Sequence, residues 1–196
     1  SFEKHFIKLN NKAKIFCYDN LISFNFILIR SIKRLILDLL KFRFKNILNY
    51  LYLIIDYLII SKKINFYKKK ILENHILEIL ENLENVFLKV DIEESEYVIL
   101  NDILKVQKKL TGLIIEFHDV ESNKDRIENF INKFQLELTH IHPNNYGKLD
   151  GNNDPSIIEL SFERNPEKIN DWNNYPHILD QVNNPKKSEI ILKFKN

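Results

Sequence analysis

The chain has 196 residues, of which 44% are hydrophobic, and it carries 29 basic and 27 acidic side chains. This length and composition are typical of one globular domain with a single sizeable core. The net charge of +2 gives no indication of a nucleic-acid-binding protein. The single cysteine, Cys17, excludes an intrachain disulfide and a cysteine-based zinc site, and it favours a reducing, cytoplasmic compartment.

The first part of the chain predicts a helix followed by a strand. Residues 2–9 have the spacing of a short helix, and residues 13–19 form an apolar run that ends at Asp19. Because the chain begins at Ser1 and contains no methionine, we expect it to be a fragment that lacks its natural start.

The next segment, residues 21–83, contains no glycine or proline and has apolar residues at three- and four-residue spacing. This pattern predicts two long helices and a third, with breaks near Lys45 and at residues 61–65. We interpret residues 21–85 as a helical insertion.

From residue 86 onwards, strands and helices alternate. Strands are predicted at 86–92, 112–119, 136–142 and 156–163, with helices at 95–109 and 123–134. This alternation indicates an α/β fold with a mostly parallel sheet and helices on both faces. Residues 166–196 contain three prolines and form a loop-rich tail, which ends in a strand-like segment at 189–194.

The helical segment 21–60 has uncharged runs at 20–29 and 46–55, each about half the length that a membrane-spanning helix needs. We expect a hairpin that packs on the sheet edge or caps a cleft. Two alternatives remain: a surface for a partner helix, and a basic amphipathic surface that rests on anionic lipid. The basic residues of that surface are Arg30, Lys33, Arg34, Lys41, Arg43 and Lys45.

Acidic residues follow two of the predicted strands. Asp19 could accept hydrogen bonds from the hydroxyls of a ribose, or simply end its strand and cap the next element. Asp91 and Glu93 flank Ile92 and therefore point to the same side of an extended chain, and Glu96 falls one helical turn beyond Glu93. Such carboxylates can orient a cationic ligand, act as a base or bind a metal. Alternatively, Glu94 and Glu96 only complement the dipole of the following helix.

Histidines and a carboxylate lie near the ends of the next predicted strands. Glu116 and His118 alternate on one strand, and His140 and His142 alternate on another. Together they could form an acid/base pair or a facial metal triad, although we assign no metal ligands from the sequence. The following loop, HPNNYG, presents three expected substrate contacts: Asn144, Asn145 and Tyr146.

Several segments together resemble the FkbM family of S-adenosylmethionine-dependent methyltransferases. In chain order they are SFEKHFIKL, KIFCYD, FLKVDIEESEYVIL, GLIIEFHD, LTHIHPNNYG and PSIIELSF. The resemblance covers roughly residues 1–19 and 86–165. It implies a Rossmann-like class I methyltransferase fold, incomplete at the N-terminus, that transfers a methyl group to a hydroxyl oxygen of a sugar or glycan-like acceptor.

The resemblance also implies roles for individual residues. Asp19, Asp91 and Glu93 match positions that bind the cofactor, S-adenosylmethionine. Glu116, His118, His142 and Asn145 match positions around the acceptor pocket. The roles considered above for individual residues and the resemblance together make three residues candidate catalytic bases: Asp91, His118 and His142. They make four residues candidate substrate-binding residues: Glu116, Asn144, Asn145 and Tyr146.

The chain departs from the family in two places. Glu94 stands where the family usually has glycine, and the family's glycine-rich cofactor loop should come just before SFEKHF. Two rival interpretations follow. One is a non-catalytic remnant, and the other is a membrane-surface or interaction protein whose main functional element is the basic helices.

Overall fold

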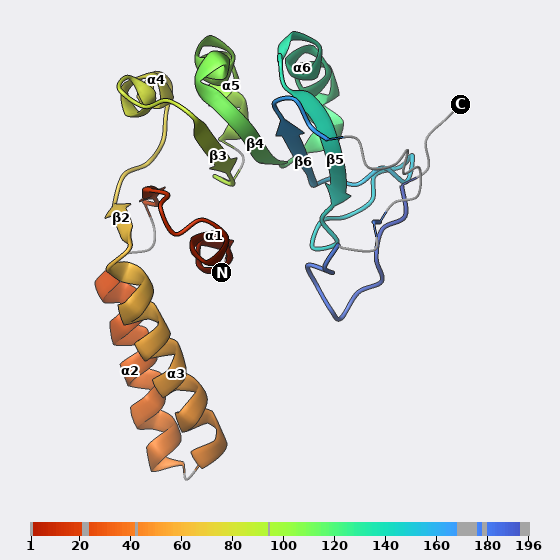
Figure 1. Cartoon of the computed structure of the whole chain (residues 1–196). Helices are drawn as coiled ribbons and strands as arrows, with labels where there is room; N and C mark the ends of the chain where they lie inside the picture. Colours follow the sequence, from red (N-terminus) through yellow and green to blue (C-terminus); the bar gives the residue numbers. More distant parts are fainter. Residues whose placement is uncertain are drawn as a thin grey trace. The chain divides into compact units, whose positions relative to one another are not determined.

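The computed structural model describes residues 2–20, 24–41, 43–93, 95–167, 176–177 and 180–192. These residues form two compact units, Ser1–Ile71 and Leu72–Asn196. Figure 1 labels their helices and strands.

The first unit contains a small parallel sheet. Its elements are α1 (Phe2–Leu9), β1 (Ile15–Tyr18), α2 (Phe24–Leu40), α3 (Phe44–Ser61) and β2 (Ile64–Tyr67). Strands β1 and β2 are parallel, and the rings of Tyr18 and Tyr67 stack at 5.0 Å. The predictions of α1, β1 and both long helices are confirmed. Strand β2 was not predicted, because its four residues lie inside a segment with helical spacing, and only pairing with β1 defines them as a strand.

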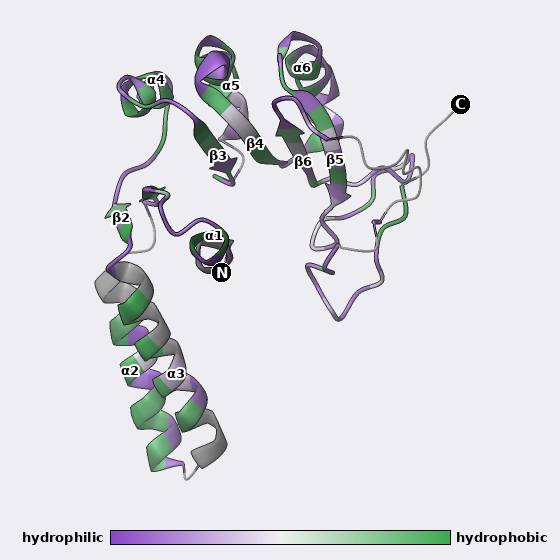
Figure 2. Cartoon of the chain, in the orientation of Figure 1, coloured by the Kyte–Doolittle hydropathy of each residue, from purple (hydrophilic) through white to green (hydrophobic). Residues whose placement is uncertain are grey.

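Helices α2 and α3 pack against each other as a hairpin. The least exposed side of α2 carries Leu28, Ser31, Leu35 and the buried Asp38, at three- and four-residue spacing, as expected of the side that faces α3. Green, which marks hydrophobic residues in Figure 2, recurs along both helices. Several of the hydrophobic residues of these helices are exposed. Of the described helices, none combines the length and the apolar character that crossing a membrane requires.

The second unit is a four-stranded sheet with helices. Its elements are α4 (His75–Leu80), β3 (Val86–Val90), α5 (Glu96–Val106), the 3₁₀ helix η1 (Gln107–Lys109), β4 (Leu110–Phe117), α6 (Val120–Lys133), β5 (Glu137–Pro143) and β6 (Ile158–Glu163). The strand order is β3-β4-β6-β5. Helices α4, α5 and α6 lie along one face of the sheet (Figure 1).

The sheet is mixed. Strands β3 and β4 are parallel, and β6 is antiparallel to both of its neighbours, β4 and β5. Strands β3, β4 and β5 therefore all run in the same direction. The α/β prediction is confirmed, but the prediction of a mostly parallel sheet is wrong for this unit. The reason lies in the link from β5 to β6, which is a loop rather than a crossover helix and so lets β6 return antiparallel.

The core of the second unit lies between the sheet and its helices. Leu113, Ile115 and Phe117 alternate along β4 and are fully buried on the helix-covered side. Phe130 of α6 packs edge to face against Phe117 and Phe162. The intervening residues of β4 point to the other face of the sheet. They include Glu116, and His118 continues their alternation just past the end of the strand.

The tail does not form the predicted edge strand where it is described. Residues 189–192 have no strand structure, and residues 193–196 lie outside the described part of the chain.

Candidate functional site

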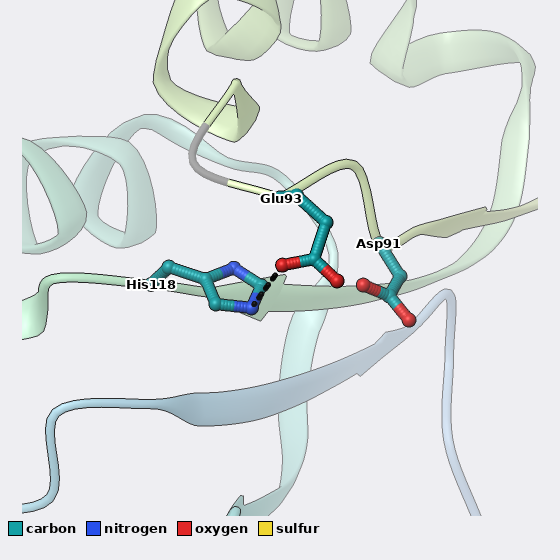
Figure 3. A group of neighbouring side chains, drawn as sticks. All are labelled: Asp91, Glu93 and His118. Atoms are coloured by element: carbon teal, nitrogen blue, oxygen red, sulfur yellow. Dashed lines mark ion pairs between the residues drawn. The ribbon is translucent and has the colours of Figure 1, made fainter. Parts of the chain in front are cut away.

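Three strand ends meet at one edge of the four-stranded sheet. Asp91 directly follows β3, His118 directly follows β4, and Asn144 directly follows β5. Since these strands run in the same direction, their carboxyl ends lie at the same edge, where open α/β sheets bind their ligands. Figure 3 shows Asp91, Glu93 and His118 gathered at this edge.

The imidazole of His118 lies among carboxylates. Its Nε2 is 3.6 Å from Glu93 Oε2 and 3.6 Å from Glu116 Oε1. One side-chain ligand atom from each of Asp91, Glu93 and His118 can be chosen so that all three lie within 4.8 Å of one another. The side chain of Glu93 is 82% exposed and that of His118 is only 11% exposed, so the cluster opens to solvent on its Glu93 side.

The turn between β3 and α5 directs Glu93 toward His118. Glu93 has a φ of 50°, in the left-handed region that residues with side chains seldom adopt. The sequence suggested that Glu94 must make this tight turn in place of glycine. Glu94 lies outside the described residues, and the left-handed residue within the described part of the turn is Glu93.

Glu96 fixes the other side of the His118 ring. Its Oε1 is 3.1 Å from His118 Nδ1 and accepts a hydrogen bond from the backbone amide of Ile92. Glu96 is fully buried, and its Oε2 has no hydrogen-bond partner among the described residues. From the sequence, Glu96 could either belong to the acidic cluster or only complement the dipole of the following helix, and its contact with His118 was not predicted. The spacing of Glu93 and Glu96, one helical turn apart, was the available signal.

The surroundings of His118 favour its charged form. The hydrogen bond to Glu96 is the main cause that raises the pKa of His118 to about 9, and the charges of Glu96, Glu116 and Glu93 raise it further, while burial lowers it. Around neutral pH His118 is therefore mainly an imidazolium, which makes it a poor proton acceptor.

The surroundings of Glu116 favour its neutral form. Burial is the main cause that raises the pKa of Glu116 above its ordinary value; a hydrogen bond from Asn144 lowers it, and the charge of Asp91 raises it. That hydrogen bond runs from Asn144 Nδ2 to Glu116 Oε1 at 2.9 Å. Asn144 thus orients one oxygen of Glu116, and the raised pKa makes this carboxylate a better base than an ordinary surface carboxylate.

Helices α5 and α6 hold the backbone at His118 in place. The hydroxyl of Tyr97 donates a 2.6 Å hydrogen bond to the carbonyl oxygen of His118. Arg126 in turn donates to the carbonyl of Tyr97 at 3.0 Å, and its guanidinium lies 4.8 Å from the centre of the Tyr97 ring. No pattern in the sequence indicated a part for Tyr97 or Arg126 in the site.

The remaining predicted residues lie in other settings. His142 Nε2 is 3.1 Å from Glu189 Oε1. In the sheet, His142 of β5 pairs with Glu159 of β6, and Glu159 pairs in turn with Glu116 of β4. Asn145 holds the tail: its Nδ2 donates to the Asn184 carbonyl at 3.0 Å, and its Oδ1 accepts from the Asn184 amide at 2.7 Å. This binding to the tail is a structural role for Asn145.

Two further predicted residues are Tyr146 and Asp19. Tyr146 is 60% exposed in the loop after β5. Asp19 follows β1 in the first unit, where its amide donates a hydrogen bond to the Tyr67 carbonyl. His140, to which we assigned no strong role, is 2.8 Å from Asp180.

A cavity of about 190 Å³ lies between α5 and α6, and it is not the site. It is lined by Tyr97, Leu100, Asn101, Leu104, Arg126, Asn129 and Phe130. None of the clustered carboxylates lines it, so the strand-end cluster is the better candidate site despite its open shape.

Comparison of the chain with protein-family models, with curated proteins and with solved structures found no match.

Proposed function

We propose that the protein transfers a methyl group from S-adenosylmethionine to a hydroxyl oxygen of a sugar or glycan-like acceptor, as its resemblance to FkbM methyltransferases implies. One observation carries this proposal: Asp91, Glu116, His118 and Asn144 lie together at the carboxyl ends of three strands that run in the same direction. That edge is the general ligand-binding position of α/β sheets. The family resemblance assigns cofactor and acceptor residues to the same strand ends.

The side chains of the cluster fit both the cofactor and the acceptor of such a reaction. Carboxylates such as Asp91 and Glu93 can accept hydrogen bonds from the ammonium and hydroxyl groups of the cofactor. Asp19 would serve its ribose. When bound, the cofactor supplies a methyl group that is already activated, which leaves alignment of the acceptor oxygen and removal of its proton to the protein.

The charge state of the cluster favours Glu116 over His118 as proton acceptor. With a pKa of about 9, His118 carries a proton around neutral pH and can instead donate a hydrogen bond to the acceptor or a carboxylate. Glu116 has a raised pKa and an oxygen oriented by Asn144. Asp91 and His142 remain candidate bases, with His142 engaged by Glu189.

The test is binding of S-adenosylhomocysteine to the full-length protein, measured by titration calorimetry in buffer with EDTA. We expect Asp91→Asn and Asp19→Ala each to weaken binding about tenfold or more, because each removes a charged hydrogen-bond acceptor. The matched control is Glu121→Gln, an exposed acid in the first turn of α6, which should leave the affinity unchanged.

Two outcomes would contradict the proposal. Absence of binding by the full-length wild-type protein would favour the non-catalytic remnant. Unchanged affinity in Asp91→Asn would remove the strand-end cluster from the cofactor site.

A second candidate function, contact with a membrane surface, is favoured by the α2–α3 hairpin. Ile29, Ile32, Ile36, Leu39 and Leu40 are all more than 40% exposed and recur at helical spacing on α2. The exposed basic residues Arg30, Lys33 and Arg34 interleave with them and fall on an adjoining side of the helix. An exposed apolar stripe beside a basic one is the pattern of helices that rest on anionic lipid.

The membrane candidate predicts binding to vesicles that contain phosphatidylserine. Replacing Arg30, Lys33 and Arg34 by glutamine should weaken binding roughly a hundredfold, since each basic side chain near such a surface contributes about 1 kcal/mol. Cosedimentation at two salt concentrations measures the loss. The matched control replaces the exposed Lys68, Lys69 and Lys70, which makes the same charge change after β2. Equal losses in both triple variants would contradict a specific role for the hairpin.

A further inference from the structure

We infer that Asp91, Glu93 and His118 form a binding site for one divalent cation of the Mn²⁺ or Zn²⁺ class. This site would exist whether or not the protein transfers methyl groups. One ligand atom from each of the three side chains lies within 4.8 Å of the other two. Figure 3 shows the three side chains close together.

The orientation of His118 is that of a metal ligand. Its Nδ1 is engaged by the buried carboxylate of Glu96 at 3.1 Å, and this leaves Nε2 facing Glu93 and Glu116. Histidines that bind metals usually have their second ring nitrogen held in this way by a carboxylate or a carbonyl, which fixes the tautomer and the ring direction. Glu96 is fully buried and unavailable to solvent, so it acts as the orienting group.

The cluster also has an excess of negative charge. Four carboxylates, those of Asp91, Glu93, Glu96 and Glu116, surround one imidazole, which carries at most one positive charge. Among the described residues, the ion pairs that these carboxylates make involve only His118. Of these carboxylates, Glu96 and Glu116 are buried or nearly so, and the buried Glu96 Oε2 has no hydrogen-bond partner in the described chain. Such carboxylates are costly without a compensating cation. A divalent cation would supply that charge.

The residue types indicate which cation fits. Carboxylate oxygens alone would suit Mg²⁺ or Ca²⁺, whereas an imidazole nitrogen favours transition metals. A set with both kinds of ligand fits Mn²⁺ or Zn²⁺ best. Metal–ligand bonds of about 2.0 to 2.2 Å require the three ligand atoms to move slightly closer together. Glu93 and Asp91 have the freedom to do so, since both are exposed.

An organic cation, such as the ammonium group of the cofactor, is the alternative occupant of the carboxylates. It would pair with Asp91 and Glu93 only, because the charged form of His118 repels it. A metal ion uses all three side chains at once, and it takes the place of the proton on Nε2 of His118, which is released to solvent.

The experiment titrates EDTA-treated, full-length protein with Mn²⁺ alone and counts free Mn²⁺ by electron paramagnetic resonance. We expect one Mn²⁺ per chain in the wild type. Pulsed electron paramagnetic resonance should show a coupling between the bound Mn²⁺ and an imidazole nitrogen. His118→Ala should abolish that coupling and weaken binding at least about tenfold, and Glu96→Gln should weaken it about tenfold or more through the orientation of His118. Asp91→Asn, an exposed position where folding is not at stake, should also weaken it.

Two matched controls should bind Mn²⁺ like the wild type: His75→Gln, whose ring accepts a hydrogen bond from the Leu72 amide, and Glu121→Gln. Absence of Mn²⁺ binding in the wild type, or binding by both Asp91→Asn and His118→Ala that is as tight as in the wild type, would overturn the metal site. A bound Mn²⁺ without imidazole coupling would overturn the assignment of His118. Because S-adenosylhomocysteine binding is measured in EDTA, failure of one proposal is distinguishable from failure of the other.

Discussion

The free energy of unfolding should fall by roughly 2 to 3 kcal/mol between pH 6 and pH 9.5, because folding raises the pKa of His118. That pKa is about 9 in the folded protein against an ordinary value of 6.5. The folded state therefore holds the proton more tightly than the unfolded state. The resulting stabilisation is fully present below pH 6.5 and is lost as the pH rises through 9. Urea denaturation in buffer with EDTA measures this change.

The variant Glu96→Gln should flatten this dependence. Glutamine keeps an acceptor for the Ile92 amide but removes the charge whose hydrogen bond is the main cause of the raised pKa. The His118 pKa, followed by NMR, should then fall toward 6.5. The control Glu121→Gln removes an exposed acid from α6 and should leave both curves as in the wild type. A His118 pKa that stays near 9 in Glu96→Gln would contradict the assigned role of Glu96.

The substitution Phe117→Ala should destabilise the second unit by about 3 to 5 kcal/mol. Phe117 is fully buried, with its ring 5.6 Å from that of Tyr97 and 6.3 Å from that of Phe130. Alanine leaves a cavity between β4 and the helices that these packed rings cannot fill. Since a domain of this kind has a total stability of about 5 to 15 kcal/mol, the loss is a large fraction of it. Circular dichroism during urea denaturation measures the change.

Val98→Ala is the matched control for the cavity. Val98 lies on α5 next to Tyr97 but is 47% exposed, so its truncation should change the stability by less than about 0.5 kcal/mol. A similar loss in both variants would mean that the core is not where the burial of Phe117 indicates.

The candidate site could be predicted in part, because strand ends are visible in the sequence. Asp91 and His118 follow apolar runs, and strands that run in the same direction bring their carboxyl ends together. The role of Glu96 could not be predicted, since a first-turn acid of a helix has the same pattern whether it faces solvent or the core. The hydrogen bonds of Asn145 could not be predicted for a similar reason: the tail that it binds is 39 residues away in sequence.

By itself, the sequence determined the local elements of this protein, because helical and strand periodicities are short-range properties of the chain. It predicted α1, β1, the α2–α3 hairpin and the strands of the second unit. The tertiary structure alone decided three things that depend on pairing between distant segments. These are strand β2 through its pairing with β1, the antiparallel insertion of β6 between β4 and β5, and the burial of Glu96 against His118. Hydrogen bonds and desolvation between segments more than 20 residues apart leave no periodic signal in a single sequence.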